Sequence, residues 1–197
     1  AILTFGDETI PDISNCDVLD DKIECVGDEN AILANDWNNN NILALQNCAD
    51  DISVTVTSDF DFANYLVTCG QSGILAVIYT IADECGNATT LSATLTIEDT
   101  TAPTFTVPVD VNIECDQDLS DVTLTGDVTD ETDLCSGNLE ATYTDAIADG
   151  SCANESIITR TWSLTDDCDN TTTLIQTITV QDTTAPTFTV PADVTLE

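Results

Sequence analysis

The decapeptide DTTAPTFTVP at residues 99–108 returns unchanged at residues 182–191. A shorter form of the same signal, DETIP, stands at residues 7–11, and each copy follows a short run of alternating apolar residues. The spacing from 99 to 182 is 83 residues, and the spacing from 7 to 99 is 92 residues. Periods of this length suit one compact β domain, so the chain is predicted to be built from repeats.

These signals divide the sequence into four parts. We expect residues 1–6 to be the last strand of a preceding repeat, 7–98 and 99–181 to be two complete domains, and 182–197 to be the first strand of a following repeat. The first complete domain has an insertion at about 29–47. Apolar residues at helical spacing predict a short helix there from about Asn30 to Asn38, followed by asparagine-rich coil.

Short runs of alternating apolar residues predict strands in both repeats. In the second repeat, such runs are Val122–Thr125, 139–143, a strand with Ile158, Trp162 and Leu164 on one face, and a last strand with Ile178 and Val180. Turn signals separate them, as is typical of an antiparallel β-sandwich. We therefore predict an all-β chain of tandem Ig-like antiparallel β-sandwich domains stapled by disulfides, with a short helical insertion in the first domain.

The charge of the chain limits the partners that it can bind. It has 37 acidic and two basic residues, a net charge of −35, and 42% hydrophobic residues, which is enough for packed cores. Such a surface repels nucleic acid phosphates and anionic membranes and attracts cations. No run approaches the roughly 18 apolar residues of a membrane span. We expect no nucleic acid partner and no membrane insertion in this segment.

Nine cysteines without any histidine or methionine argue for disulfides in an oxidising compartment. The chain has no histidine for a Ser-His or Cys-His pair and no glycine-rich phosphate loop, and its many aspartates make any single carboxylate pair uninformative. We therefore expect no enzymatic activity and no organic cofactor.

Three motifs together resemble a known family. The DTTAP linker, the IEC strand end at 113–115, and the D-[DE]-C-[GD]-N turns at 83–87 and 166–170 resemble those of the hyalin-repeat-like (HYR-like) Ig-type domains. Those domains stand in tandem in very large secreted surface proteins of Bacteroidetes, including gliding-motility and adhesion proteins. The resemblance implies an extracellular or cell-surface segment of a stalk, filament or adhesin. Its implied partners are neighbouring repeats or adjacent identical subunits.

Four cysteines recur in register in the two repeats: Cys25, Cys48, Cys69 and Cys85, then Cys115, Cys135, Cys152 and Cys168. Four cysteines allow three pairings. Strand direction places the first and third of each set at one end of a domain and the second and fourth at the other. We therefore predict the bridges Cys115–Cys152, Cys135–Cys168, Cys25–Cys69 and Cys48–Cys85. Cys16 is left over, either as a buried free thiol or bonded to a neighbouring chain or repeat.

Acidic residues gather at the end of each domain that faces the preceding linker. Carboxylates and amides on flexible loops are what calcium requires, so we predict an inter-domain calcium site that fixes the angle between domains. Its candidate ligands are Asp99, Asp130, Glu131, Asp133, Asp166, Asp169 and Asn170, with Asp7, Asp83 and Asn87 in the first domain. In the alternative interpretation these residues only solvate the surface and cap turns.

A second hypothesis makes the first repeat a direct glycan- or protein-binding domain. Trp37 beside Asn38, Asn39 and Asn40 would suit a sugar, and inserted loops often carry binding. A Trp37 packed in the core would favour the stalk, and an exposed Trp37 would favour binding.

Two further expectations concern the linkers. The DTT tripeptides at 99–101 and 182–184 look like the short O-glycosylation motif of secreted Bacteroidetes proteins, which implies glycans on Thr100 and Thr183. Phe188 and Val190 are expected to lie exposed on an unpaired edge that recruits a partner.

Overall fold

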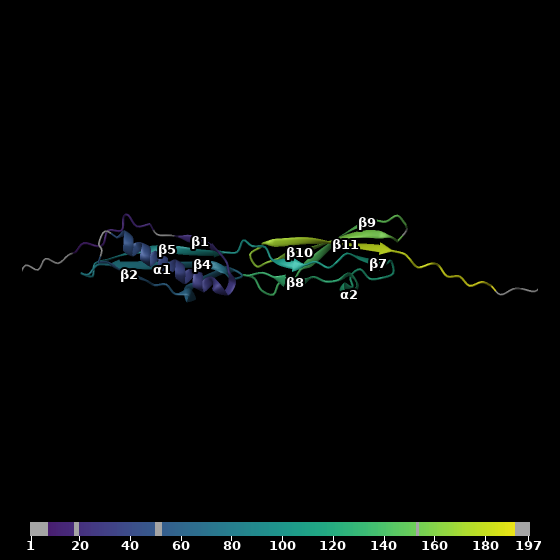
Figure 1. Cartoon of the computed structure of the whole chain (residues 1–197), viewed down its shortest axis with the longest axis horizontal. Coiled ribbons are helices and arrows are strands. Elements are labelled where there is room, and N and C mark those ends of the chain that lie inside the picture. The colour runs from purple at the N-terminus through teal and green to yellow at the C-terminus, as the bar shows by residue number, and fades with distance from the viewer. Residues whose placement is uncertain (1–7, 18–19, 50–52, 153, 192–197) are drawn as a thin grey trace, which may run out of the picture. The chain divides into compact units, whose positions relative to one another are not determined.

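The computed structural model describes residues 8–17, 20–49, 53–152 and 154–191 (Figure 1). The chain is mostly β and forms several sheets. It divides into two compact units, which are described separately. Unit 1 comprises the residues up to Thr104 together with Thr132–Leu139 and Thr165–Thr172, and unit 2 comprises the remainder. Two loops of the second sequence repeat therefore belong to unit 1.

The sheet of unit 1 has the order β1-β5-β4-β2, and β3 pairs with β4 as well. These strands are β1 (Asp21–Glu24), β2 (Thr55–Ser58), β3 (Leu66–Cys69), β4 (Ser72–Ala82) and β5 (Ala88–Glu98). β1 runs parallel to β5, and the other pairs are antiparallel. Alternate residues of β4 and β5, such as Leu75, Tyr79 and Leu95, are fully buried, as the alternating pattern predicts.

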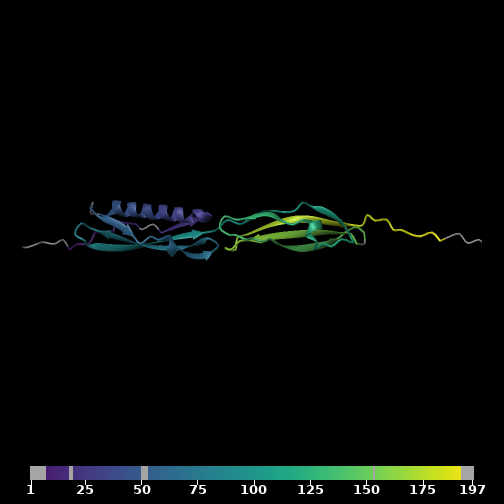
Figure 2. The ribbon, with the colours of Figure 1, turned by 90° about the horizontal axis from the view of Figure 1, so that it is seen from below.

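Helix α1 (Asn30–Cys48) covers one face of this sheet (Figure 2). The prediction of a short helix that ends near Asn38 is wrong, because the helix continues through all four asparagines. Ala34, Trp37, Asn41 and Leu45 recur at helical spacing and are buried. Asparagine is a weak helix former, by roughly 0.7 kcal/mol per residue relative to alanine, and packing of this buried stripe outweighs that cost. Two 3-10 turns, η1 (Gly27–Glu29) and η2 (Phe62–Asn64), flank the helix and β3.

Unit 2 contains a four-stranded sheet of order β7-β11-β10-β9 and a separate β6-β8 pair. Its strands are β6 (Thr104–Thr106), β7 (Val111–Glu114), β8 (Thr129–Thr132), β9 (Thr142–Asp149), β10 (Ser156–Thr165) and β11 (Thr171–Gln181). β7 pairs with β11 in parallel, with Glu114 opposite Gln181, just as Glu24 lies opposite Glu98 in unit 1. The sequence repeat is thus visible in the strand register, while the Ig-like assignment itself stays a prediction.

Residues Val122–Thr125, predicted as a strand, form the one-turn helix α2. The Asp121 side chain caps this turn by accepting a hydrogen bond from the Thr123 N–H at 2.9 Å, and Gly126 ends it with a φ of 86°. Local capping therefore overrides the alternating pattern. No helix among the described residues is long and apolar enough to cross a membrane.

Two buried polar side chains hold the α2 segment against the sheet of unit 2. Arg160 is fully buried, makes two 2.9 Å hydrogen bonds to Asp145, and donates to Thr125 Oγ1 and the Leu119 carbonyl at 3.0 Å. Gln176, also fully buried, donates to the carbonyls of Val109 and Thr125 and accepts from Trp162 Nε1. In the first repeat these two places are occupied by Val77 and Ala93.

A glutamate at the end of the first strand binds the start of each DTTAP signal. Glu24 accepts hydrogen bonds from the N–H and Oγ1 of Thr100 and from Thr101 Oγ1, at 2.8 to 2.9 Å. Glu114 binds the N–H and Oγ1 of Thr183 in the same way. The hydroxyls expected to carry glycans are therefore hydrogen-bond donors here, and a glycan would replace that donation. Beyond this contact, residues 182–191 form no strand, and Phe188 and Val190 are exposed.

We expect Glu24→Gln to change how stability depends on pH. The hydrogen bond from the Thr100 N–H, aided by the Thr hydroxyls, lowers the pKa of Glu24. Its contribution is therefore present above the ordinary pKa of glutamate and lost as pH falls through the lowered value. At pH 7 Glu24→Gln should be less stable than the wild type by under about 1 kcal/mol and should melt at a slightly lower temperature, and the two melting temperatures should converge as the pH falls below the lowered pKa. A constant difference across this pH range, or the same behaviour in the control Glu84→Gln, would contradict the assignment.

Arg160→Ala should destabilise unit 2 by about 3 kcal/mol or more, since it removes four hydrogen bonds and leaves a cavity. Arg160→Lys should recover only part of that loss, because lysine cannot bind Asp145 with a planar fork. Denaturant unfolding measures both effects. The matched control is Lys22→Ala, which breaks an exposed ion pair with Glu98 and should cost under about 1 kcal/mol. Equal losses for Arg160→Ala and Lys22→Ala would refute the structural role of Arg160.

Candidate metal centre

Three disulfides shape unit 1. Cys25 is bonded to Cys135 and Cys69 to Cys168, across sequence separations of 110 and 99 residues. Both bonds attach loops of the second sequence repeat to strand ends of the first. The third bond joins Cys16 to Cys48 at the end of α1.

All four predicted pairings within repeats are wrong, and Cys16 is neither free nor intermolecular. For the predicted Cys25–Cys69 bond the reason is strand order. Cys25 follows β1 and Cys69 ends β3, so two strands, β5 and β4, lie between them. Three steps of about 4.8 Å separate such positions by roughly 14 Å, whereas a disulfide needs Cα atoms about 4.4 to 6.8 Å apart. Cys85, Cys115 and Cys152 are free and exposed.

Glycines admit the first of these loops. A Cβ on Gly27 would lie 2.6 Å from the Leu134 carbonyl oxygen, and a Cβ on Gly70 would lie 2.5 Å from the Cys135 carbonyl oxygen. Both residues also have positive φ values, 68° and 52°. The pattern of a glycine one or two residues after Cys25 and Cys69 is the sequence signal that could have indicated close approach of another backbone at these sites.

Aspartates hold both loops in shape. Asp133 Oδ1 accepts hydrogen bonds from the N–H groups of Cys135 and Ser136 at 2.7 and 2.9 Å. Asp166 Oδ1 accepts from the N–H groups of Cys168 and Asn170 at 2.8 and 2.9 Å. These bonds fix where each carboxylate lies, and they leave lone pairs available on both groups.

The carboxylates of Asp99, Asp133 and Asp166 meet in unit 1. Each offers an oxygen, and the three oxygens lie within 4.8 Å of one another. Asp99 and Asp166 are only 8% and 6% exposed. Asp99 Oδ2 is buried without any hydrogen-bond partner among the described residues. Burial raises the pKa of Asp99, and the negative charges of Asp133, Asp166 and Glu24 raise it further.

This arrangement fits a hard divalent cation. Calcium binds oxygen ligands at about 2.3 to 2.6 Å, so two ligands of one ion can lie up to roughly 5 Å apart. The observed spacing is within that limit, and all three groups are oxygen donors. A cation would compensate the repulsion among the carboxylates and give Asp99 Oδ2 a partner. Backbone carbonyls or water would complete the coordination.

None of the other predicted carboxylate ligands among the described residues joins this cluster. Asp130 and Glu131 belong to unit 2, where Glu131 accepts a hydrogen bond from the Ala141 N–H at 2.6 Å. Asn170 donates its side-chain N–H groups to Asp166 and to the Asp99 carbonyl, and Asp169 is a turn residue with a φ of 69°.

In the first repeat, Asp83 and Asn87 form the same kind of turn. The predicted ligand Asp7 lies outside the described residues.

The structure does not support the asparagine-rich insertion as a contact loop. Trp37 is 7% exposed and packs edge-on against Tyr79, with ring centroids 6.5 Å apart. Asn38 is also buried, while Asn39 and Asn40 are exposed on the outer side of α1. The prediction that Trp37 offers its face to a ligand is therefore wrong.

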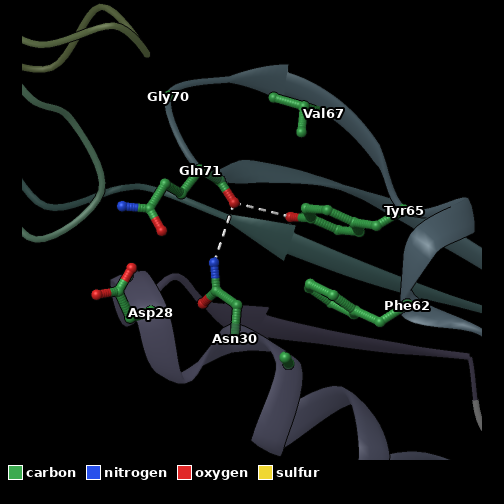
Figure 3. Close-up of a pocket in the computed structure, with 9 residues that line it drawn as sticks. Asp28, Asn30, Phe62, Tyr65, Val67, Gly70 and Gln71 are labelled. Carbon is green, nitrogen blue, oxygen red and sulfur yellow. Dashed lines mark hydrogen bonds between the residues drawn. The ribbon is translucent and has the colours of Figure 1, made fainter.

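A hollow of about 300 Å³ lies beside the start of α1 (Figure 3). Phe62 and Tyr65 stack along it with ring centroids 4.9 Å apart. The Tyr65 hydroxyl and Asn30 Nδ2 both donate to the Gln71 carbonyl at 3.0 Å. Burial also raises the pKa of Tyr65 to about 12. Since these two polar groups are already bonded to Gln71, the hollow is a weaker candidate site than the aspartate cluster.

Comparison with known proteins leaves the family of this chain open. No family model and no curated protein matches it. The crystal structure of Drosophila N-cadherin EC1-4 is similar at 16% identity and a TM-score of 0.33, covering 66% of this chain and 41% of that one. The human desmocollin-1 ectodomain is similar at 14% identity and a TM-score of 0.27, covering 57% and 28%. The chain thus spans less than half of either structure, and likenesses this weak carry no conclusion about its fold or role.

Proposed function

We propose that this chain is a structural segment of an extracellular repeat-array protein, such as a stalk, surface filament or adhesin, and that disulfides and calcium stiffen it. The observation that carries the proposal is the buried, unpartnered Asp99 Oδ2 beside two carboxylates, Asp133 and Asp166, whose loops are anchored by disulfides. Three disulfides support a location in an oxidising environment outside the cell. The buried Trp37 favours this role over glycan binding by the insertion.

The mechanical part of the proposal follows from which segments the cluster joins. Asp99 stands immediately after β5, while Asp133 and Asp166 stand on loops that disulfides hold at the ends of β1 and β3. An ion bound to all three would attach the segment that leaves β5 to both loops. Two covalent links and one ionic link would then resist separation of these loops from the sheet.

Calcium should raise the melting temperature under non-reducing conditions. A ligand at 100 times its dissociation constant stabilises by about 2.7 kcal/mol, which corresponds to a shift of several degrees for a domain of this size. Asp99→Asn should abolish the shift and should be at least as stable as the wild type in chelator, because it removes a buried charge. The matched control is Asp182→Asn, which changes the exposed repeat counterpart of Asp99 and should keep the full response.

The melting temperature is measured by scanning calorimetry at increasing calcium concentrations. The ionic strength is held fixed, because any salt screens a net charge of −35. A shift of equal size in the wild type and in Asp99→Asn would show general screening and would remove the proposed site. The absence of any shift in the wild type would do the same.

Removing a loop anchor should weaken calcium binding as well as the fold. The double variant Cys69→Ser/Cys168→Ser frees the loop that carries Asp166 and should lose up to about 4 to 5 kcal/mol on the chain-entropy model. Its calcium affinity should fall, since the loop must be ordered when the ion binds. The control Cys16→Ser/Cys48→Ser removes a disulfide that does not hold either loop, and it should keep the wild-type affinity. Equal calcium affinity in both double variants would contradict the proposed dependence of calcium binding on the Cys69–Cys168 bond.

A further inference from the structure

The three free thiols follow a pattern set by the bonds in unit 1. The four cysteines of each repeat can be numbered in chain order. The Cys25–Cys135 bond then joins the first cysteine of one repeat to the second cysteine of the next. Cys69–Cys168 joins the third of one repeat to the fourth of the next. By this rule, the partners of Cys115 (first) and Cys152 (third) would belong to a repeat beyond the second. The partner of Cys85 (fourth) would be the third cysteine of a repeat before the first.

Those are the three cysteines that are free and exposed in the structure. The rule therefore accounts for each unpaired thiol in the chain. One cysteine departs from it: Cys48, the second of the first repeat, is bonded to Cys16 instead of to an earlier repeat. The α1 insertion, whose last residue is Cys48, distinguishes this position from Cys135.

The surroundings of Cys115 in unit 2 repeat those of Cys25 in unit 1. The Cys115 N–H donates to the Gln181 carbonyl at 2.9 Å, and the Cys25 N–H donates to the Glu98 carbonyl at 2.8 Å. Each cysteine follows a strand that pairs in parallel with the last strand of its repeat. Each is also preceded by the glutamate that binds the linker threonine. Cys115 is therefore held as Cys25 is held, without a partner.

Cys152 lies at the same end of the unit 2 sheet. It stands in the connection before β10, as Cys69 stands just before β4. A tight turn closed by the Asp166 N–H and the Asn170 carbonyl joins β10 to β11, so the start of β10 lies beside the end of β11. β11 lies between β7 and β10, so two strand spacings, roughly 10 Å, separate Cys115 from Cys152, which is too far for a bond between the two.

Two other features match a missing neighbour. The turn of Cys85 has the hydrogen bonds of the turn of Cys168, with each cysteine N–H donating to an aspartate Oδ1 at 2.8 Å. Phe105 is 8% exposed where β6 pairs with β8, whereas its repeat counterpart Phe188 is 85% exposed. A further repeat would supply both the missing thiols and the missing strand.

We infer that the end of unit 2 bearing Cys115 and Cys152 is a docking surface for two cysteine loops of a further repeat of this kind, which two disulfides then close. Cys85 presents one of the matching loop thiols for a repeat on the other side. The inference rests on the disulfide pattern, and it holds whether or not the aspartate cluster binds calcium.

Each bond forms by oxidation of two thiols, which lose two protons and two electrons. A disulfide such as oxidised glutathione accepts the electrons through a mixed disulfide and leaves as two thiols. Partial desolvation, together with Asp182 and Asp116, raises the pKa of the Cys115 thiol. Cys115 is therefore mainly protonated at neutral pH and a poor nucleophile on its own. Alignment with an incoming loop would favour the intended bond over random oxidation.

The test extends the chain by one repeat: residues 1–181 followed by a second copy of residues 99–197. The substitutions Cys115→Ser and Cys152→Ser are made only in the appended copy, where they remove the two thiols that would otherwise stay unpaired. The protein is oxidised in a glutathione redox buffer that contains a chelator, and its disulfides are mapped without reduction. We expect Cys115 to be linked to the appended copy of Cys135, and Cys152 to the appended copy of Cys168. The bonds Cys25–Cys135 and Cys69–Cys168 provide the internal reference for folding.

The matched control also carries Cys135→Ser and Cys168→Ser in the appended copy. Without reductant, Cys115 and Cys152 should be fully alkylated in the control. In the extended chain that keeps both appended thiols, the alkylated fraction of each should be less than about a tenth. Free thiols in both proteins, or a Cys115–Cys152 bond, would overturn the inference. Because the chelator is present throughout, failure here is distinct from failure of the calcium site, which the calorimetric titration tests alone.

Discussion

Two disulfides that cross the repeat boundary determine how unit 1 is built. Cys25–Cys135 and Cys69–Cys168 bring loops from residues 132–139 and 165–172 onto strand ends formed by residues 21–24 and 66–69. The close approach of backbones at Gly27 and Gly70, the buried position of Asp166 and the meeting of three carboxylates all depend on these loops being there. The acidic cluster thus forms where covalent attachment holds the loops of Asp133 and Asp166 close to Asp99.

The two repeats use one strand framework and cover it by different means. In unit 1 the apolar side chains of a long helix share one buried cluster with Val77, Ala93 and their neighbours on the sheet. In unit 2 the corresponding positions are Arg160 and Gln176. Both donate hydrogen bonds to Thr125, so the short helix α2 is attached to the sheet by hydrogen bonds. A buried guanidinium is tolerable because Asp145, Thr125 and a carbonyl group satisfy its N–H groups. The repeat register therefore constrains the strands and leaves the covering layer free to vary.

Sequence reasoning succeeded where the pattern is local and failed where it depends on spatial order. The alternation around Ile158, Trp162 and Leu164 predicted a strand with one buried face, which the structure confirms. The prediction of purely antiparallel sheets was wrong, because β1 pairs with β5, and β7 with β11, in parallel. The cysteine pairing depended on strand order, which no spacing reveals. The length of α1 depended on tertiary burial of Asn38 and Asn41. The predicted acidic region contained the three aspartates whose carboxylates meet, but the pattern did not reveal the hydrogen bonds that Glu131 and Asn170 make.

The overlap of the two long disulfides also changes how unit 1 would transmit load. Along the backbone, Cys25 and Cys168 are 143 residues apart (168 − 25), a contour of roughly 490 Å when fully extended. Through the Cys25–Cys135 bond, only the 33 residues from 135 to 168 remain between them, or roughly 115 Å. Under tension applied between Cys25 and Cys168, the disulfide would stop extension at less than a quarter of the backbone contour length. Between Cys25 and Cys168, unit 1 could therefore extend only as far as this shorter path allows.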